Sequence, residues 1–140
     1  MIDLNVVSAK LVELDKRVRR VQVLRKADAA AYVSDETAAE LVSFNLMLAV
    51  QAASDLAAHL IADQDWEPAA TTGEAFGRLS EHGVITAMVA GHLRRAVGFR
   101  NAVAHGYAQL RPDLLHIAAT SGLDDLVEFS RAVASWLPRE

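Results

Sequence analysis

The sequence has no cysteine, only three prolines and seven glycines among 140 residues, and few aromatic side chains. The absence of cysteine excludes disulfide frameworks, thiolate zinc sites and cysteine nucleophiles. It also agrees with a reducing cytoplasm, where we expect the protein to act. Proline and glycine are too rare, and hydrophobic residues at 52% too common, for a disordered or low-complexity chain. The composition therefore predicts a packed core.

The chain also lacks an excess of positive charge and long apolar runs. Its formal net charge is −4, whereas a general nucleic-acid coat would be basic, so any RNA binding has to be local. The longest apolar runs, such as residues 46–50, are too short to cross a bilayer. The first residues show no pattern of a secretory signal. We expect a single helical domain over residues 1–140 with no membrane partner.

Apolar spacing predicts helices along most of the chain. In the first helix the apolar residues recur in steps of three and four, at Leu4, Val7, Leu11, Leu14, Val18 and Val21. The other predicted helices cover residues 35–62, 71–82, 84–103, a short stretch from Pro112, and 123–137. No β-type alternation of useful length occurs. The prediction is an all-α, up-and-down bundle of four or five main helices.

Residues that suit helix ends accompany these segments. Residues 34–37, which read Ser-Asp-Glu-Thr, offer N-cap residues and first-turn acids. Thr37 with Glu40, and Thr71 with Glu74, have the spacing of a capping box at a helix start. Gly106 is placed to stop the helix that precedes it.

The most informative segment is residues 100–107, which read Arg-Asn-Ala-Val-Ala-His-Gly-Tyr. Arg100 supplies a permanent cation that fits phosphate oxygens, and His105 is the side-chain type best suited to proton transfer near neutral pH. RNA carries its own nucleophile, the 2′-hydroxyl, so a base and a cation suffice for cleavage without a metal. We assign His105 to proton transfer and Arg100 to the phosphate. Asn101 would orient the phosphate or hold Arg100.

Two further considerations apply to this segment. One histidine cannot easily act as both base and acid, so a second copy of the pair across a two-fold axis predicts an active homodimer. The alternative interpretation is that Arg100 and His105 cap carbonyl groups at the end of a helix. Similarly, Tyr107 taken alone is interpreted as a half-buried aromatic that anchors the chain after the helix.

The motif Arg-Asn-x-x-x-His resembles the signature of the HEPN superfamily. The longer form Arg-x4-His-x-Tyr resembles its HepT branch, the toxin half of HepT–MntA-type toxin–antitoxin pairs. The resemblance covers most of the chain, through residues 51–59, 68–76, 83–85, 97–101 and 123–129. It implies a homodimeric ribonuclease toxin that works without metal or cofactor, has its active cleft between subunits and uses Arg100 and His105 as catalytic residues.

The resemblance also implies regulation by a partner. An MntA-like nucleotidyltransferase antitoxin would adenylylate Tyr107, which places bulk and negative charge beside Arg100 and blocks an RNA phosphate site. Two other functions compete with this one. In the first, the chain is a non-catalytic nucleotide- or phosphate-binding module that regulates a nucleotidyltransferase. In the second, it is a purely structural dimerisation bundle.

Asn45, Asp55 and His59 are predicted to project from one sector of the second helix. Asp55 and His59 are four residues apart and therefore able to touch. Either Asp55 orients a group such as Arg100 from the facing helix, or the two form a buried polar pair. We expect no metal on them, because the Glu-x-x-His repeats of helix-bundle metal sites are missing.

Six of the eleven residues 16–26 are basic. Such a run guides an RNA backbone by neutralising phosphates, forms the solvated face of an amphipathic helix, or meets an acidic partner. The sequence leaves these three possibilities open.

Overall fold

The computed structural model describes residues 2–105 and 111–138, and these ranges contain helices and no strands. In chain order the helices are α1 (Leu4–Leu24), α2 (Ala29–Ser34), α3 (Glu36–Asp63), α4 (Thr72–Glu81), α5 (Ala87–Ala104), α6 (Pro112–Ala119) and α7 (Ser121–Trp136). Five of them, α1, α3, α4, α5 and α7, have ten or more residues. The predicted all-α bundle is confirmed.

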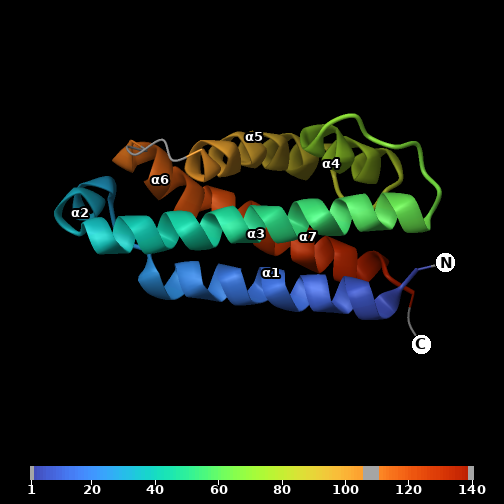
Figure 1. Ribbon diagram of the computed structural model, residues 1–140, viewed down its shortest axis with the longest axis horizontal. Helices are drawn as coiled ribbons and strands as arrows, with labels where there is room; N and C mark the ends of the chain where they lie inside the picture. Colours follow the sequence, from blue (N-terminus) through green and yellow to red (C-terminus); the bar gives the residue numbers. More distant parts are fainter. Residues whose placement is uncertain (1, 106–110, 139–140) are drawn as a thin grey trace.

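Helix α3 is the centre of the bundle. It packs against each of the other six helices, with α1 along one side and α5 along the other (Figure 1). Helix α7 crosses behind it, and α1 begins at the same end of the bundle at which α7 ends (Figure 1). This central place explains the alanine-rich sequence of α3, because small residues such as Ala49, Ala53 and Ala57 are fully buried between neighbours.

The predicted stripe of the first helix is the buried face of α1. Val7, Leu14, Val18 and Val21 are buried in the core, whereas Val12 and Val23 outside the stripe are exposed. Burying such side chains contributes about 1.5–3 kcal/mol each relative to leaving them in water. The stripe therefore decides which side of α1 faces α3 and α7.

The starts of the helices follow local capping chemistry. At α3 the capping residue is Asp35, whose carboxylate accepts the backbone N–H of Ala38 at 3.0 Å. The predicted box of Thr37 and Glu40 is therefore wrong, because α3 begins before Thr37. At α4 the Thr71 hydroxyl accepts the N–H of Glu74 at 3.1 Å, as predicted. The Glu74 carboxylate reaches one residue further back, to the N–H of Ala70.

Two helices differ from the predicted segments. The prediction omitted α2, a six-residue helix that buries Tyr32 and is too short to show a periodic pattern. Helix α5 begins at Ala87 rather than at Val84, because the Thr86 hydroxyl accepts the N–H of Val89 at 3.1 Å and caps the helix there. Val84 and Ile85 are nevertheless buried, which explains why they extend the apolar pattern.

Helix α3 is also long and apolar enough to cross a membrane, and no other helix in the described part of the chain is. Within its most apolar window 56% of the residues are buried by the rest of the protein. A core helix of a globular domain has this pattern.

Candidate active site

Arg100 and His105 lie on the last turns of α5. The helix ends at Ala104, and His105 is its capping residue, with its backbone N–H donating to the carbonyl oxygen of Asn101 at 3.0 Å. Gly106 and Tyr107 lie outside the described residues, so the predicted helix stop and the predicted modification site are not placed. Arg100 is half-buried, whereas Asn101 and His105 are exposed.

The guanidinium of Arg100 is held by the neighbouring helix. Its Nη1 donates to the side-chain oxygen Oε1 of Gln51 on α3. Its Nε is buried and has no hydrogen-bond partner among the residues that the structure describes. Because Arg100 is held by Gln51, the expected alternative in which Asn101 holds it is not the arrangement found. A guanidinium with unused donors is a suitable binding group for an oxyanion.

The contact continues from Gln51 across α3 to α1. The amide Nε2 of Gln51 donates to Oδ1 of Asp55 at 2.8 Å. The other carboxylate oxygen, Oδ2, lies 3.4 Å from the ammonium of Lys10 on α1. The polar contacts therefore extend over three helices and connect four residues: Arg100, Gln51, Asp55 and Lys10. We call these four residues the polar chain.

The predicted pair of Asp55 and His59 is not formed. Asp55 is occupied by Gln51 and Lys10, and Nε2 of His59 lies 2.9 Å from a carboxylate oxygen of Asp63, one turn further along α3. The prediction that Asp55 orients Arg100 from the facing helix fits the geometry only indirectly, because Gln51 stands between the two.

Asn45 also points elsewhere. Its amide nitrogen donates to the carbonyl of Leu41 at 2.8 Å, and its oxygen accepts from Arg17 on α1 at 3.1 Å. Asn45 is buried, and it ties α1 to α3 rather than joining the polar chain.

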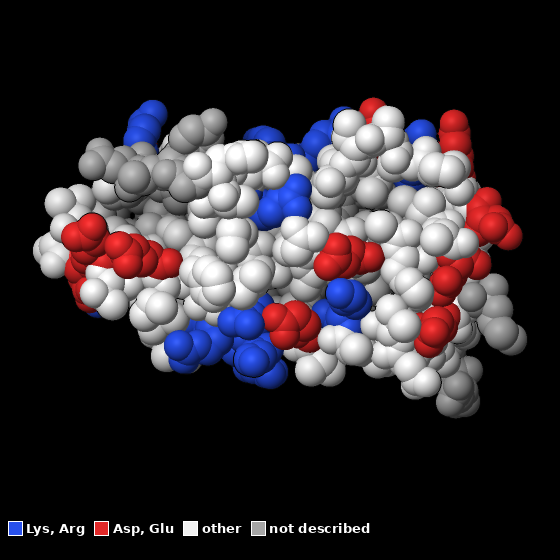
Figure 2. Space-filling model, in the orientation of Figure 1, with Lys and Arg blue, Asp and Glu red and all other residues white. Residues whose placement is uncertain are grey.

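The basic run on α1 divides into two groups. Three of its members have partners within the fold: Arg17 contacts Glu13 and Asn45, Arg25 donates to the carbonyl of Ala119, and Lys26 pairs with Asp35. Lys16, Arg19 and Arg20 are exposed. Figure 2 shows basic side chains gathered over the second half of α1, while acidic side chains are more scattered on this face. Arg25 is exposed as well, but its guanidinium is bound to Ala119, so Lys16, Arg19 and Arg20 are the members most available to a phosphate backbone.

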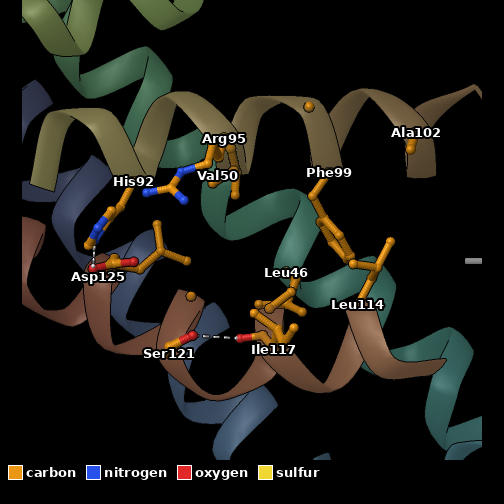
Figure 3. A pocket seen from close by; sticks show the side chains of 15 residues that line it. Leu46, Val50, His92, Arg95, Phe99, Ala102, Leu114, Ile117, Ser121 and Asp125 are labelled. Carbon is orange, nitrogen blue, oxygen red and sulfur yellow. Dashed lines mark hydrogen bonds and ion pairs between the residues drawn. The ribbon is translucent and has the colours of Figure 1, made fainter. Parts of the chain in front are cut away.

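A separate cavity of about 570 Å³ is lined by residues of α3, α5, α6 and α7 (Figure 3). Its lining is mostly apolar. Arg95 lines it as well, together with His92 and Asp125, whose Nδ1 and Oδ1 atoms lie 2.9 Å apart. Figure 3 shows Phe99 and Leu114 pointing into the space from opposite sides. The contact of His92 with Asp125 ties α5 to α7. Arg100 does not line this cavity.

The charged groups with shifted pKa values lie away from Arg100. The pKa of Glu13 is lowered by its hydrogen bond from Arg17, and that of Asp35 by the backbone N–H of Ala38 and then by Lys26. Arg111 lowers the pKa of Asp113 in the same way. Across residues 2–105 and 111–138, no group of three or more histidine and acidic side chains is placed to hold a metal ion.

Comparison with known proteins decides the family. A family model described as "Ribonuclease HepT-like" matches residues 14–133. The chain belongs to the HepT-like ribonucleases. This membership confirms the resemblance to HEPN and HepT proteins and the expectation of an RNA-cleaving enzyme. The matched segment includes Arg100 on α5 and both Gln51 and Asp55 on α3.

Individual relatives agree with this assignment of the HepT-like chain. The mRNA nuclease HepT of Shewanella oneidensis is 24% identical over 125 residues, which are 89% of this chain and 93% of the relative. The tri-AMPylated HEPN toxin of the same organism, solved in complex with its MNT antitoxin, superposes with a TM-score of 0.84 at 24% identity, covering 96% of this chain and 99% of that one. The cytosolic protein YutE of Bacillus subtilis, of unknown function, superposes with a TM-score of 0.79 at 14% identity, over 99% of this chain and 96% of that one. At these identities the structural likeness shows the HEPN fold.

Two residues of the polar chain in this HepT-like protein, Gln51 and Lys10, were missed at the level of sequence. Gln51 is four residues before the predicted Asp55 on a predicted helix, a spacing that signals a possible side-chain contact. Lys10 lies 45 positions before Asp55 and Arg100 lies 49 positions after Gln51, and no local pattern connects them to α3. Only the packing of α1 and α5 on α3 brings them together.

Proposed function

We propose that this HepT-like protein is an endoribonuclease toxin that cleaves RNA by attack of the 2′-hydroxyl on the adjacent phosphate. Arg100 would bind the scissile phosphate and His105 would transfer the proton, with Asn101 orienting the phosphate and Asp55 supporting Arg100 through Gln51. The family and the relative named as an mRNA nuclease support this class of reaction. The cytoplasm, where RNA is abundant, is the proposed place of action, and YutE is a cytosolic relative in fold.

One observation carries the proposal. A half-buried arginine, held by an amide and with donors still unpaired, stands five residues before an exposed histidine at the end of the same helix. An arginine that only capped the helix would direct its donors to the last carbonyl groups of α5. Arg100 instead reaches across to α3, so capping does not account for it.

In the proposed reaction a bond forms between the 2′-oxygen and phosphorus, and the bond from phosphorus to the 5′-oxygen breaks. His105 accepts the proton of the 2′-hydroxyl, and the leaving 5′-oxygen gains a proton from a second acid. Arg100 stabilises the negative charge that develops on the phosphate oxygens. The expected products are a 2′,3′-cyclic phosphate and a 5′-hydroxyl, and this scheme uses neither a metal nor a cofactor.

Helical geometry supports a homodimer. Residues five apart on an α-helix point about 140° away from each other, so Arg100 and His105 of one subunit diverge. A second copy of the chain would bring its own pair to the same phosphate. It would also supply the second acid that the leaving oxygen needs.

The decisive experiment compares three variants in a defined RNA cleavage assay and in a growth assay. Arg100→Ala is expected to abolish both cleavage and toxicity, and Arg100→Lys to retain a small part, because lysine keeps the charge but loses the fork of donors. The control is Arg131→Ala, an exposed arginine on α7 that pairs with Glu128. Full cleavage by the Arg100→Ala protein would contradict the proposal.

The proposed partner is an MntA-like nucleotidyltransferase antitoxin that adenylylates Tyr107. Two structural relatives support it: the AMPylated HEPN toxin bound to its MNT antitoxin, and a toxin–antitoxin protein solved with AMP-PNP, which has a TM-score of 0.85 and 22% identity. Co-expression with such an enzyme is expected to raise the intact mass by whole AMP units and to stop cleavage. Tyr107→Phe is expected to prevent the mass gain and to leave cleavage intact.

The same assays separate the competing functions. Wild-type protein that binds phosphate or nucleotide through Arg100 but cleaves no RNA would favour the regulatory module. Protein that dimerises, and neither binds nor cleaves, would favour the structural bundle.

A further inference from the structure

We propose that Gln51 is a positioning residue for Arg100, whose neutral amide fixes the guanidinium without cancelling the charge that the phosphate requires. The inference rests on the proposed ribonuclease function and names a residue that acts through Arg100 rather than on RNA. Neither the sequence motif nor the family match singles out this side chain.

The direction of the hydrogen bonds in the polar chain requires an amide at this position. The Asp55 carboxylate can only accept, so it takes the N–H of the Gln51 amide at 2.8 Å. The amide oxygen is thereby turned towards Arg100, whose guanidinium can only donate. An amide has both a donor and an acceptor, so its two ends match these two neighbours. Asp55 therefore sets the orientation of Gln51, and Gln51 sets that of Arg100.

The neutrality of the amide matters as much as its direction. A carboxylate at position 51 would pair with Arg100 through strong charge-assisted bonds and compete with the RNA phosphate for the same donors. It would also stand beside the negative Asp55. The amide accepts from a single nitrogen of Arg100 and adds no net charge. An arginine that is held but not neutralised is what a phosphate-binding site needs.

Asp55 and Lys10 support the amide from behind with a smaller contribution. Their contact spans 3.4 Å, and the side chains are 39% exposed for Lys10 and 41% exposed for Asp55. Exposed ion pairs of this kind contribute little to stability. We therefore infer that Lys10 steadies Asp55, whereas the direction of the Gln51 amide depends on Asp55 itself.

The test compares Gln51→Leu and Gln51→Glu with the wild type in steady-state RNA cleavage from pH 5 to pH 8. Gln51→Leu removes the support, and we expect kcat to fall roughly tenfold to a hundredfold, because small misplacement of a catalytic group has effects of this size. Gln51→Glu should fall further at pH 8. Its activity relative to the wild type should then rise as the pH falls, because protonation of the introduced carboxyl removes the competing charge.

The ratio to the wild type is the important readout, because any pH effect that is common to both proteins cancels in it. A purely structural role of Gln51 would give a ratio that does not change with pH. The matched control is Gln64→Glu, the same charge change at the residue that caps the C-terminal end of α3, and its cleavage should equal that of the wild type. Thermal unfolding of each variant shows whether it is folded.

If Gln51→Leu fails to fold, Asp55→Ala provides a second variant at a half-exposed position. It removes the acceptor of the Gln51 amide N–H, and the expected fall in kcat has the same direction and is smaller. Wild-type cleavage by the Gln51 variants, or a ratio of Gln51→Glu to wild type that stays flat with pH, would overturn the positioning role. If Arg100→Ala is inactive in the same assay, the ribonuclease proposal stands without a positioning role for Gln51. Full activity of Arg100→Ala would instead contradict both the ribonuclease function and the positioning role.

Discussion

The two halves of α5 differ in what they bury. In the first half Val89, Ala90 and Leu93 are buried against neighbouring helices, whereas no side chain from Arg94 to Ala104 is fully buried. Apolar burial thus fixes one end of the helix, and the other end carries Arg100 and His105 on a rigid continuation of it. This division allows a polar side chain to be held in place and still be reached by a ligand. Stability and proposed activity should therefore respond to substitutions in different halves.

The largest expected effect is on activity in the second half. His105→Ala should lower RNA cleavage by about 10²–10⁴-fold, the usual contribution of a general acid or base. Its melting temperature should hardly change, because His105 is exposed. His82→Ala is the matched control, since His82 likewise caps the C-terminal end of a helix, α4, and is exposed. A His105→Ala protein that cleaves normally but melts earlier would support the capping interpretation instead.

The first half should show the opposite response. Leu93 is 1% exposed, and Leu93→Ala should lower the free energy of unfolding by about 2–5 kcal/mol through lost burial and a residual cavity. Below its melting temperature the folded protein should cleave RNA at the normal rate. Urea denaturation measures the stability. A pair of identical changes sharpens the contrast, because Val89→Ala removes a buried group and Val97→Ala a half-buried one on the same helix. Equal losses of stability for these two would contradict the division of α5.

A smaller effect is expected where α5 meets α7. Asp125→Asn weakens the 2.9 Å contact with His92, whose side chain is 35% exposed. Partly exposed pairs contribute at most about 1 kcal/mol, so a slight loss of stability and unchanged RNA cleavage are expected. A large loss of cleavage would mean that the cavity beside His92 takes part in the reaction, and that activity is not confined to the face of Arg100.

The same comparison explains which features were predictable from the sequence. The buried stripe of α1 and the start of α4 at Thr71 are local patterns, because periodicity and capping need only neighbours in the chain. Helix α2 is too short for a period to show. The motif at Arg100 was readable because its residues are close together in sequence.

Side-chain partners were not readable in this way. Asp55 and His59 have the spacing of a contact, yet each has a nearer partner, Lys10 and Gln51 for the first and Asp63 for the second. A spacing of four makes a contact possible, and tertiary packing decides between competing ones. For the same reason Gln51 could not be connected with Arg100, which lies 49 positions later.

The smallest expected effect lies at the start of α3, about 24 Å along the helix from Gln51. The N–H of Ala38 and then Lys26 lower the pKa of Asp35 in the folded protein. The ionised group therefore stabilises the fold at pH values above its unfolded pKa, and this contribution is lost as the pH falls through the folded pKa. Asp35→Asn keeps a capping side chain but does not titrate. At pH 7 the Asp35→Asn protein should be slightly less stable than the wild type, and this difference should shrink below about pH 4. Thermal melts of both proteins measure it. RNA cleavage at pH 7 should stay normal, and a loss there would show that the far end of α3 also controls Arg100.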